Sequence, residues 1–432
     1  MTVTSAKGPD PLRAPAPATK VSTRVRTHRL AFVSAVVSLV ASFAANAAPV
    51  PLYNVYRTED GLDNAGISLA VVAYSLGTIA ALLLLGRVSN HWGRRRTAIL
   101  SLGRVLLGCL VLLNVHEVGT LVVGRLFMGF GSGIASSSLT AYIVDTAPTR
   151  PAWLSPVASS QGPMLGLAVG AIGSGALVGF GPLPRHLVYL VTIVLLVLSA
   201  VLIAMSPETV TPRPGAWRSM RPQVRVPARI RHLLPVATAV FLATWATGSF
   251  YQALVPAVIE DQLHTRSPLT LGLVFAAYMA SSAFAAPLGG RFTPATAQRA
   301  GMVAFLAAMT GILTAIAAGR LLVFIAATFV AGASQGVAIS ATVRALLYRS
   351  KLGDRAPIFS VIYLLSYSGA AFPSLIAGAL SNALSLPKIA LGYGGLALVA
   401  TLFTVVAAQD PADGGPYRMR AGRNSVDRTA RP

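Results

Sequence analysis

The sequence predicts an all-α membrane protein of twelve transmembrane helices, arranged as two pseudo-symmetric six-helix bundles. Three observations lead to this fold class. Of the 432 residues, 54% are hydrophobic and only 11% are charged, whereas about a quarter of a typical soluble domain is charged. Apolar windows of bilayer length recur along the whole chain. Several motifs also repeat between the two halves of the chain at a nearly constant offset.

Each apolar window is long enough for a helix that crosses a hydrocarbon core roughly 30 Å thick. The predicted spans are 30–53, 66–86, 97–115, 119–143, 153–180, 186–205, 233–258, 269–290, 299–318, 321–345, 356–381 and 387–408. The least distinct junction lies around Gly319-Arg320. The predicted organisation is a disordered tail (1–29), an N-terminal bundle (30–205), a linker (206–232), a C-terminal bundle (233–408) and a second tail (409–432).

Basic residues give the orientation. With the N-terminus inside, 28 of the 35 Lys and Arg residues fall on the cytoplasmic side and five on the outer side. The remaining two, Arg104 and Arg125, lie within spans. This asymmetry predicts that both termini are cytoplasmic. It also explains the net charge of +22 without a nucleic-acid partner.

The two halves of the chain carry matching residues. The offsets between matches are 203 to 205 positions, and the pairs are Pro51 with Pro256, Gly86-Arg87 with Gly290-Arg291, and Gly133 with Gly336. Equal numbers of spans on both sides of the linker support two homologous halves. Internal repeats of this kind commonly place a central site at their interface.

A basic stretch from Gly86 to Arg96 joins spans two and three. It resembles motif A of the major facilitator superfamily, G-x-L-x-D-x-x-G-R-[RK]-x. The matching residues are Gly86, Gly93, Arg94 and Arg95, whereas Asn90 stands where the family has Asp. In that family the motif locks the cytoplasmic helix ends during alternating access, so the resemblance implies a conformational latch. Asp145, at the cytoplasmic end of span four, is the expected partner of Arg94. The alternative is a generic basic loop that only fixes topology.

Arg125 lies inside span four and is similar to the arginine of the family's motif B. Gly129 and Gly131 also match, and Met128 replaces the usual Gln. An arginine within a span costs several kcal/mol unless it faces protein or water. It lies roughly 9 Å from the outer end, at about the depth of Asn46. We expect Arg125 to bond to Asn46 or to backbone freed near Pro49 and Pro51. The alternative is an arginine that snorkels outward and serves packing alone.

Span five carries Gly162, Pro163 and Gly166, which resemble the G-P-x-x-G core of the family's motif C. That motif marks antiporters, notably drug exporters. The match is partial, because Ala158 and Leu167 replace flanking glycines. The alternative is plain packing, in which Gly166 and Gly170 let a neighbouring helix approach closely.

None of the 13 acidic residues lies at mid-membrane by this topology. We therefore expect neutral, amphipathic or anionic substrates, because a permanent cation would lack a buried anionic partner. Proton coupling would use Asp145, Glu260, Asp261 or a proton carried by the substrate. The predicted substrate-cavity residues are polar or aromatic and lie within spans: Asn46, Arg125, Gln161, Trp245, Gln252 and Gln335. All but Gln161 lie on spans one, four, seven and ten, which line the path in the resembling family.

These observations predict a secondary active transporter that works by alternating access. Proton-linked export of small apolar or amphipathic molecules is the favoured function. An uptake symporter or facilitator for a metabolite or sugar stays open, as does a non-transporting receptor or scaffold. We find no nucleophile–base pair, phosphate cradle or metal-ligand spacing, and the single Cys109 forms no intrachain disulfide. The sequence thus predicts no enzyme, catalytic residue, cofactor or metal, and a monomer in the cell membrane of a bacterium.

Overall fold

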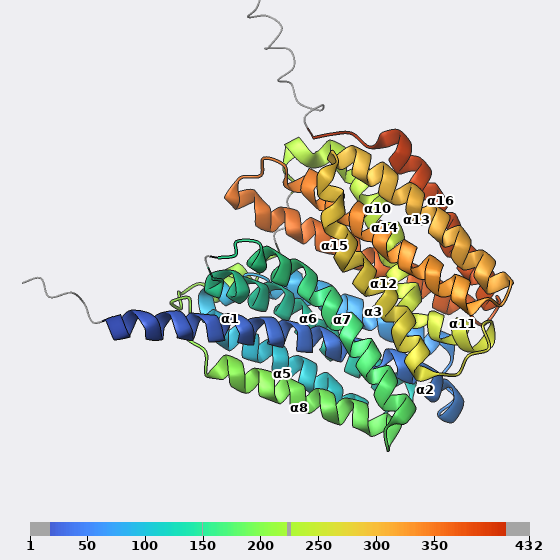
Figure 1. The fold of residues 1–432 in the computed structure, drawn as a ribbon, viewed down its shortest axis with the longest axis horizontal. Helices are drawn as coiled ribbons and strands as arrows, with labels where there is room; N and C mark the ends of the chain where they lie inside the picture. Colours follow the sequence, from blue (N-terminus) through green and yellow to red (C-terminus); the bar gives the residue numbers. More distant parts are fainter. Residues whose placement is uncertain (1–17, 149, 223–225, 412–432) are drawn as a thin grey trace, which may run out of the picture.

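The computed structural model describes residues 18–148, 150–222 and 226–411, and every regular element within them is a helix (Figure 1). The long helices are α1 (Ala18–Ala47), α3 (Asn64–Leu85), α5 (Arg94–Leu112), α6 (Val118–Thr146), α7 (Leu154–Phe180), α8 (Pro184–Ala204), α10 (Leu234–Ala253), α12 (Pro268–Ala285), α13 (Pro294–Ala317), α14 (Leu321–Leu347), α15 (Leu352–Leu380) and α16 (Leu386–Ala407). The shorter elements are η1 (Val50–Leu52), α2 (Tyr53–Glu59), α4 (Ser89–Trp92), α9 (Ala216–Ser219), η2 (Ala228–Leu233), α11 (Val255–Asp261) and η3 (Ala286–Arg291).

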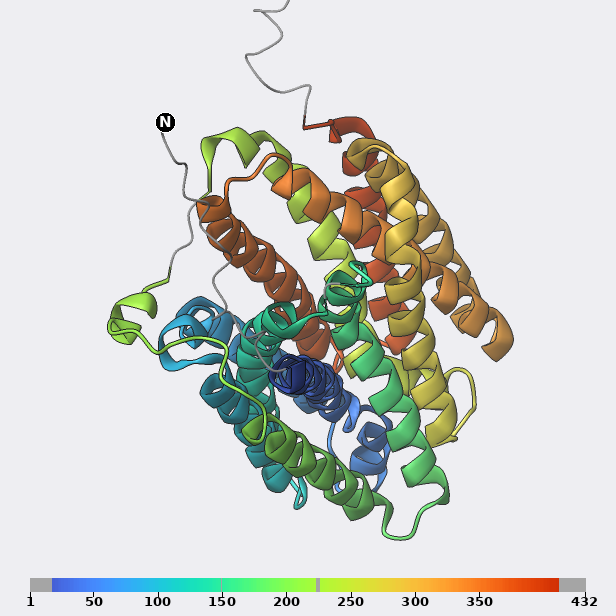
Figure 2. The same ribbon diagram turned by 60° about the vertical axis from the view of Figure 1, so that its left-hand side comes forward.

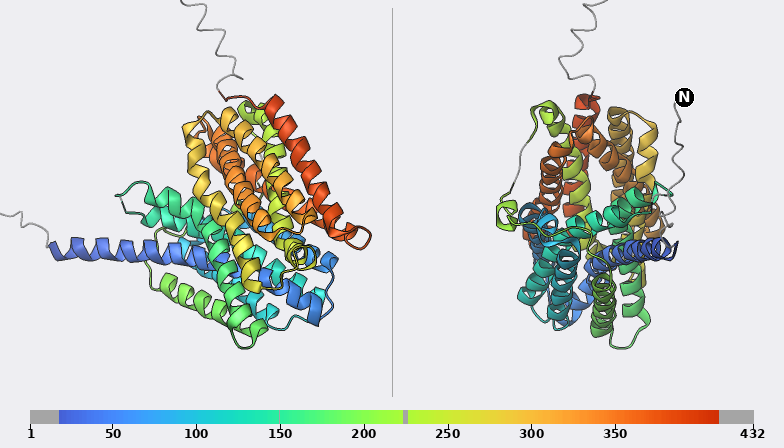
Figure 3. Two further views of the ribbon diagram at one scale, coloured as in Figure 1. Left: turned by 45° about the vertical axis from the view of Figure 1, so that its right-hand side comes forward. Right: turned by 90° about the vertical axis from the view of Figure 1, so that its left-hand side faces the viewer.

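The helices form two groups of six long helices. The first half, α1 to α8, is blue to green in Figure 1, and the second half, α10 to α16, is yellow-green to red. Figures 2 and 3 show the same two groups from other directions. The predicted fold class, two six-helix bundles of an all-α membrane protein, is confirmed. We call the face with the 86–93 loop and the 205–233 linker the linker face, and the face with α2 and α11 the opposite face.

Eleven helices of the described chain are long and apolar enough to cross a membrane. The twelfth long helix is α5, whose first turn holds Arg94, Arg95 and Arg96. These arginines lie at the linker face, and from Thr97 onward Arg104 is the only charge in the helix. α5 packs between α6 and α8 in the first half, so it takes the place of the predicted third span.

Two of the predicted spans are broken by proline. The first span ends as α1 at Ala47, and Pro49 and Pro51 follow before α2. The seventh span ends as α10 at Ala253, and Pro256 lies in the first turn of α11. A proline has no N–H to donate and clashes with the preceding turn, which explains both breaks. Because the breaks fall at equivalent places, they support the repeat.

The start of the first helix corrects the predicted tail. Within the described residues α1 runs from Ala18, so residues 18–29 are helical where the sequence predicted a disordered tail. They hold no proline or glycine, and nothing in their composition interrupts a helix that continues into the span. Residues 1–17 and 412–432 of the predicted tails, and 223–225 of the predicted linker, lie outside the described residues.

Large apolar side chains point away from the bundles. On α8 the exposed ones include Leu195, Leu198 and Leu202, and on α16 they include Val399 and Val406. In a soluble protein such surfaces would aggregate, whereas in a bilayer they contact lipid. Glycine, alanine and serine are found at the helix contacts instead. Lipid is as apolar as a leucine side chain, so no hydrophobic effect drives large apolar side chains into the bundle.

The same close contact occurs in both halves. A side chain on Gly129 of α6 would collide with the carbonyl oxygen of Tyr74 on α3. In the second half, a side chain on Gly332 of α14 would collide with the carbonyl oxygen of Tyr278 on α12. The predicted match of Gly133 with Gly336 behaves alike, since these glycines meet Thr78 and Ser282 of the same helices. The halves are therefore repeats in packing as well as in sequence.

Gly129→Ala should destabilise the protein, because the added methyl group must push α3 away from α6. Overpacking of this kind costs about 1–3 kcal/mol, and it should lower the apparent melting temperature in detergent. The matched control is Gly103→Ala on α5, where a Cβ meets nothing within 4 Å. That change should leave the melting temperature equal or raise it, because alanine favours a helix over glycine. Equal melting temperatures for the two variants would contradict the packing account.

Candidate functional site

A cavity of about 570 Å³ lies between the two halves. Helices α1, α3, α6 and α7 line it from the first half, and α10, α12, α14 and α15 line it from the second. The lining reaches the linker-face ends of three helices, at Arg87, Ser159 and Ala356. Its other end lies near Gln252 and Phe43, close to the last turns of α10 and α1. The cavity therefore opens toward the linker face.

Tight helix contacts close the opposite face. A side chain on Gly175 of α7 would come within 2.5 Å of the carbonyl oxygen of Pro268 on α12. A side chain on Gly378 of α15 would come within 2.6 Å of Ser68 on α3. Small residues thus let the two halves meet at backbone distance on this face.

Polar groups also join the halves on the opposite face. Arg57 of α2 donates to a carboxylate oxygen of Asp261 on α11 at 2.9 Å, and it lies 3.8 Å from Glu260. Asn54 of α2 donates to the backbone carbonyl of Pro256 at 2.9 Å. These contacts hold the broken ends of the first and seventh spans against each other.

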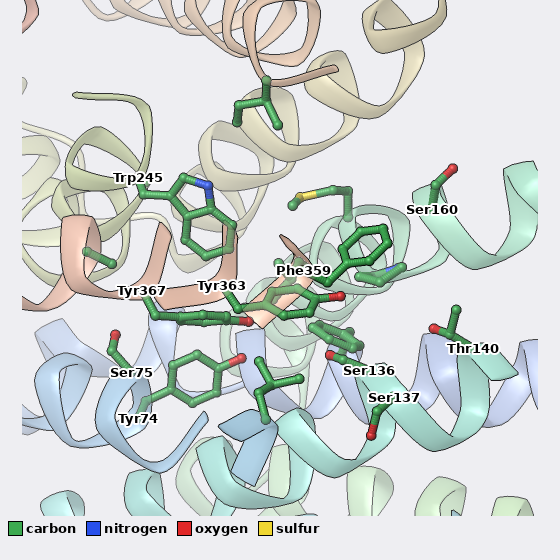
Figure 4. Close-up of a pocket in the computed structure, with 18 of the residues that line it drawn as sticks. Tyr74, Ser75, Ser136, Ser137, Thr140, Ser160, Trp245, Phe359, Tyr363 and Tyr367 are labelled. Carbon is green, nitrogen blue, oxygen red and sulfur yellow. The ribbon is translucent and has the colours of Figure 1, made fainter. Parts of the chain in front are cut away.

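Two kinds of side chain line the cavity (Figure 4). The rings of Trp245, Phe359, Tyr363 and Tyr367 lie across the middle of the view, with Ser136 and Ser137 below them and Thr140 and Ser160 to the right. The ring centres of Trp245 and Tyr367 are 4.7 Å apart. Arg87, at the linker-face end, is the only charged residue that lines the cavity among the described residues. The second half thus gives an aromatic wall, and α6 and α7 give a wall of hydroxyl groups.

The hydroxyl wall presents acceptors. Ser136 and Ser137 donate their protons to carbonyls of α6, at 2.8 and 3.0 Å. Ser159 and Ser160 donate to carbonyls of α7, both at 2.7 Å. A hydroxyl has one proton to give, so these oxygens offer only lone pairs to a molecule in the cavity.

Arg125 is fully buried, with 0% of its surface exposed. It donates to the backbone carbonyl of Asn46 at 2.7 Å, and to Oε1 of Gln252, in the other half, at 2.9 Å. Its guanidinium carbon lies 4.7 Å from the ring centre of Tyr74. No ion pair among the described residues includes Arg125. The predicted contact with Asn46 is present, and the snorkelling alternative is wrong.

The structure divides the six predicted cavity residues. Trp245, Gln252 and Gln335 line the cavity. Asn46 is 1% exposed and donates to Ser132, so it lies behind the lining. Arg125 is covered by Tyr74 and Gln252, which do line the cavity. Gln161 lies outside the lining because α7 turns its neighbours Ser160 and Pro163 inward instead. Substrate contact by any of the six stays a prediction.

Sequence reasoning missed part of the lining. Thr140, Ser159, Ser160 and Phe359 line the cavity but were not predicted to do so. Phe359 begins a series with Tyr363 and Tyr367 at intervals of four residues on α15. Such spacing places side chains on one face of a helix, so this aromatic series was a readable signal.

The basic stretch of motif A forms the predicted contact between Arg94 and Asp145, and its role as a latch stays a prediction. Arg94 donates to Asp145 at 2.9 Å and to Ser89 at 2.6 Å. Glu208, which follows α8, accepts from the backbone N–H groups of Arg94 and Arg95 at 2.7 and 3.1 Å. A carboxylate at this position caps the helix and complements its dipole. Glu208 is a member of this cluster that sequence reasoning did not identify.

Gly93 and Asn90 differ in their roles within this stretch. Gly93 has a φ of +98°, and a side chain there would lie 2.5 Å from the Glu208 carboxylate, so glycine is required by both strain and space. Asn90 is exposed, and no hydrogen bond of its side chain occurs within the described part of the chain. Gly86 lines the linker-face end of the cavity.

The residues of motif C pack α7 onto α1. A side chain on Gly162 would lie 3.1 Å from Leu39, and one on Gly166 would lie 2.6 Å from the carbonyl oxygen of Val40. Gly170 continues this face against Ala44. Pro163 lies inside α7 and lines the cavity. The glycines of this stretch therefore pack α7 against α1, while its proline forms part of the cavity wall.

Comparisons with known proteins agree with this architecture. A family model described as Major Facilitator Superfamily matches residues 30–264, which is more than half of the chain. An uncharacterized MFS-type transporter, EfpA, from Mycobacterium tuberculosis is 32% identical over 149 residues, which is 32% of this chain and 28% of that protein.

Transporters with sugar names are similar over shorter stretches. Sugar transporter ERD6-like 2 of Arabidopsis thaliana is 32% identical over 98 residues, covering 23% of this chain and 21% of that protein. H(+)/hexose cotransporter 1 of Parachlorella kessleri is 30% identical over 86 residues, covering 20% and 16%. The matched parts span less than a third of the length of these curated relatives.

Asn90→Asp places a carboxylate at an exposed position of the linker face, where it can pair with arginines of the second half once this face closes, and such a bond is stronger than one to an amide. We expect the population to shift toward the state that is closed on this face. A cysteine at Ser160, which lines the open end, should then react more slowly with a polar maleimide. The native Cys109 is 0% exposed and adds little background. Asn114→Asp, in an exposed loop on the opposite face, is the control. Equal labelling rates in Asn90→Asp and the parent would refute the prediction.

Proposed function

The chain belongs to the major facilitator superfamily of membrane transporters, and from that premise we propose that it exports small apolar or amphipathic organic molecules in exchange for protons. The observation that carries this proposal is the cavity between the halves, open on one face and closed on the other. Such an arrangement is one end state of alternating access. The other end state follows when the opposite face opens and the linker face closes.

The distribution of basic residues supports the direction. The arginine-rich segments, from the 86–96 stretch to the linker, lie on the face where the cavity opens. By the positive-inside rule this is the cytoplasmic face, so the structure corresponds to the inward-open state. A substrate made in the cell, or dissolved in the inner leaflet, could then enter directly. The packing of Gly162, Pro163 and Gly166 against α1 is in keeping with the antiporter-like motif.

The lining supports the substrate class. Five aromatic residues and Met279 form most of the apolar surface of the second-half wall, and no acidic side chain lines the cavity among the described residues. Ligand sites of this kind bury most of an apolar molecule and orient it with few polar groups. A permanently charged cation would lose its hydration without gaining a carboxylate. Neutral or anionic molecules therefore fit better than cations.

The carboxylates that join the halves are the best candidates for the groups that bind the coupled proton. Asp145 pairs with Arg94 within the first half, whereas Glu260 and Asp261 face Arg57 across the closed side. A proton taken up by either of these two carboxylates removes its charge and weakens its attraction to Arg57. We propose that protons from outside favour the opening of this face. A monomer is sufficient for the mechanism, because one chain provides both halves.

A second candidate function is uptake of a sugar or polyol. The wall of hydroxyl acceptors on α6 and α7 could accept hydrogen bonds from sugar hydroxyls, and aromatic rings can stack on sugar rings. Relatives include proteins named as sugar and inositol transporters. Export is preferred because the aromatic wall is larger than a single stacking platform.

Efflux of a neutral amphipathic dye tests the export proposal. Energised cells that produce the protein should extrude Nile red faster than cells without it, and a protonophore should abolish the difference. Ethidium, a permanent cation, should be extruded poorly. The control is cells that produce the Gly248→Val variant. Gly248 lines the cavity with open space beside it, so a valine side chain there should fill this space and slow the extrusion. Dye or sugar accumulation that the protonophore abolishes would instead establish uptake.

Arg57→Ala should loosen the opposite face, because Asp261 and Glu260 lose their bond to the other half. We expect a cysteine placed at Ser68, which is 0% exposed against α15, to become reactive from outside. The control is Arg266→Ala: Arg266 lies 3.4 Å from Glu260, but its side chain is 88% exposed and it belongs to the same half. The prediction fails if Arg266→Ala increases the labelling as much as Arg57→Ala does.

A further inference from the structure

We propose that the cavity recognises planar aromatic molecules through a carboxylate, which binds over Gly248 on α10 between Trp245 and Gln252. This inference rests on the proposed transport function and narrows its substrate class to aromatic anions. The three residues follow one another at intervals of three and four positions, so they share one face of α10. All three line the cavity.

The amide of Gln252 has a fixed orientation. Arginine has only donors, so the Gln252 atom that faces Arg125 at 2.9 Å must be Oε1. The NH₂ end of the same amide is therefore the part left to serve the cavity. No hydrogen bond of this Nε2 to another described residue occurs. Gln252 thus offers the cavity a donor and no acceptor.

Trp245 provides the second donor. Its indole Nε1 is buried and has no hydrogen-bond partner among the described residues. Buried polar groups in folded proteins are nearly always paired, and an unpaired donor in a binding cavity points to a ligand or water that completes it. An indole N–H can only donate, so its missing partner is an acceptor.

Gly248 leaves room between these two donors. A Cβ at this position would meet only Tyr278, at an ordinary contact distance of 3.9 Å. The chain therefore has free space directly above the backbone of α10, with Trp245 one turn to one side and Gln252 one turn to the other. A carboxylate has two oxygens and can accept from both sides at once.

The charges favour an anion at this place. Arg125 lies directly behind Gln252 and has no acidic partner in the described chain. Arg87, the only charged residue on the lining in the described part of the chain, is also basic. Interactions with charges are much stronger in an apolar cavity than in water, and a cleft with one sign of charge concentrates the opposite sign. The positive electrostatic potential and the two hydrogen-bond donors therefore both favour a carboxylate.

The aromatic wall suits the rest of the molecule. The rings of Trp245 and Tyr367 lie 4.7 Å apart, and Tyr363 and Phe359 extend this surface toward the open end (Figure 4). The flat rings of a ligand can stack on the faces or edges of such side chains. A molecule with a carboxylate over Gly248 would place its rings along α15.

Binding to the purified protein in detergent tests the inference without any transport step. The probes are 2-naphthoate, its neutral amide 2-naphthamide and the cation 2-naphthylmethylammonium, and calorimetry measures each affinity. We expect naphthoate to bind at least about tenfold more tightly than the cation, with the amide between them. Equal or tighter binding of the cation would overturn the proposal.

Three variants locate the site. Gln252→Glu would face Arg125 with a carboxylate and cancel its charge, so naphthoate affinity should fall at least about tenfold while 2-naphthamide affinity changes little. Trp245→Phe removes the N–H and keeps a ring, and should weaken naphthoate more than the cation. Gly248→Val fills the space above α10 and should weaken all three probes. Gln409→Glu, at an exposed position after α16, makes the same chemical change elsewhere and should alter nothing.

Binding of 2-naphthamide to Gln252→Glu shows that the variant is folded, so its loss of naphthoate binding has a specific meaning. Unchanged naphthoate affinity in Gln252→Glu would refute the assignment. The outcomes also separate this inference from the transport proposal. Selective naphthoate binding without dye efflux would support the carboxylate site and refute the export function. Dye efflux without naphthoate binding would support the export function and refute the carboxylate site.

Discussion

The burial of Arg125 is the constraint on which the arrangement of the cavity depends. A cation at mid-helix costs roughly 3 kcal/mol to insert into a bilayer, and each hydrogen bond to a charged group returns about 1.5–3 kcal/mol. The bonds to Asn46 and Gln252, together with the face of Tyr74, are therefore of the size needed to hold it. Because these partners come from α1, α10 and α3, the arginine fixes the rotation of three helices from both halves. It also determines which end of the Gln252 amide can face the cavity.

Glycine contacts explain how the helices around this cation come so close together. Gly129 meets the backbone of Tyr74, and Gly332 meets the backbone of Tyr278. The same contact thus places a tyrosine at the cavity in each half, since both tyrosines line it. The halves differ at the position equivalent to Arg125, where the second half has Thr328, which bonds to Tyr251. The repeat supplies one backbone framework, and single side chains make one half charged and the other aromatic.

The fold was largely predictable from the sequence, because hydropathy and charge placement act along the chain itself. The contact of Arg125 with Asn46 was also predictable, since the rise per residue gives each side chain its depth. Depth does not give rotation about the helix axis. For that reason the sequence could not show that Tyr74 and Gln252 cover Arg125, nor that Gln161 lies outside the cavity lining. Glu208 was missed because its partners are backbone N–H groups more than a hundred residues away, which no side-chain pattern marks.

The charged clusters on the two faces connect different parts of the molecule. At the linker face, Arg94 and Asp145 belong to the first half and Glu208 follows its last helix. Asp410 likewise accepts from the first turn of α13 within the second half. At the opposite face, Arg57 binds Asp261 across the halves. Among the described residues, the ion pairs that join the halves therefore lie on the opposite face, which also carries the pairs of Arg185 with Glu59 and Asp60 within the first half. In this conformation the halves can separate at the linker face without the loss of any of these ion pairs, whereas opening the opposite face requires Arg57 to release its carboxylates. In this conformation the opposite face is thus the one that a loss of charge can release.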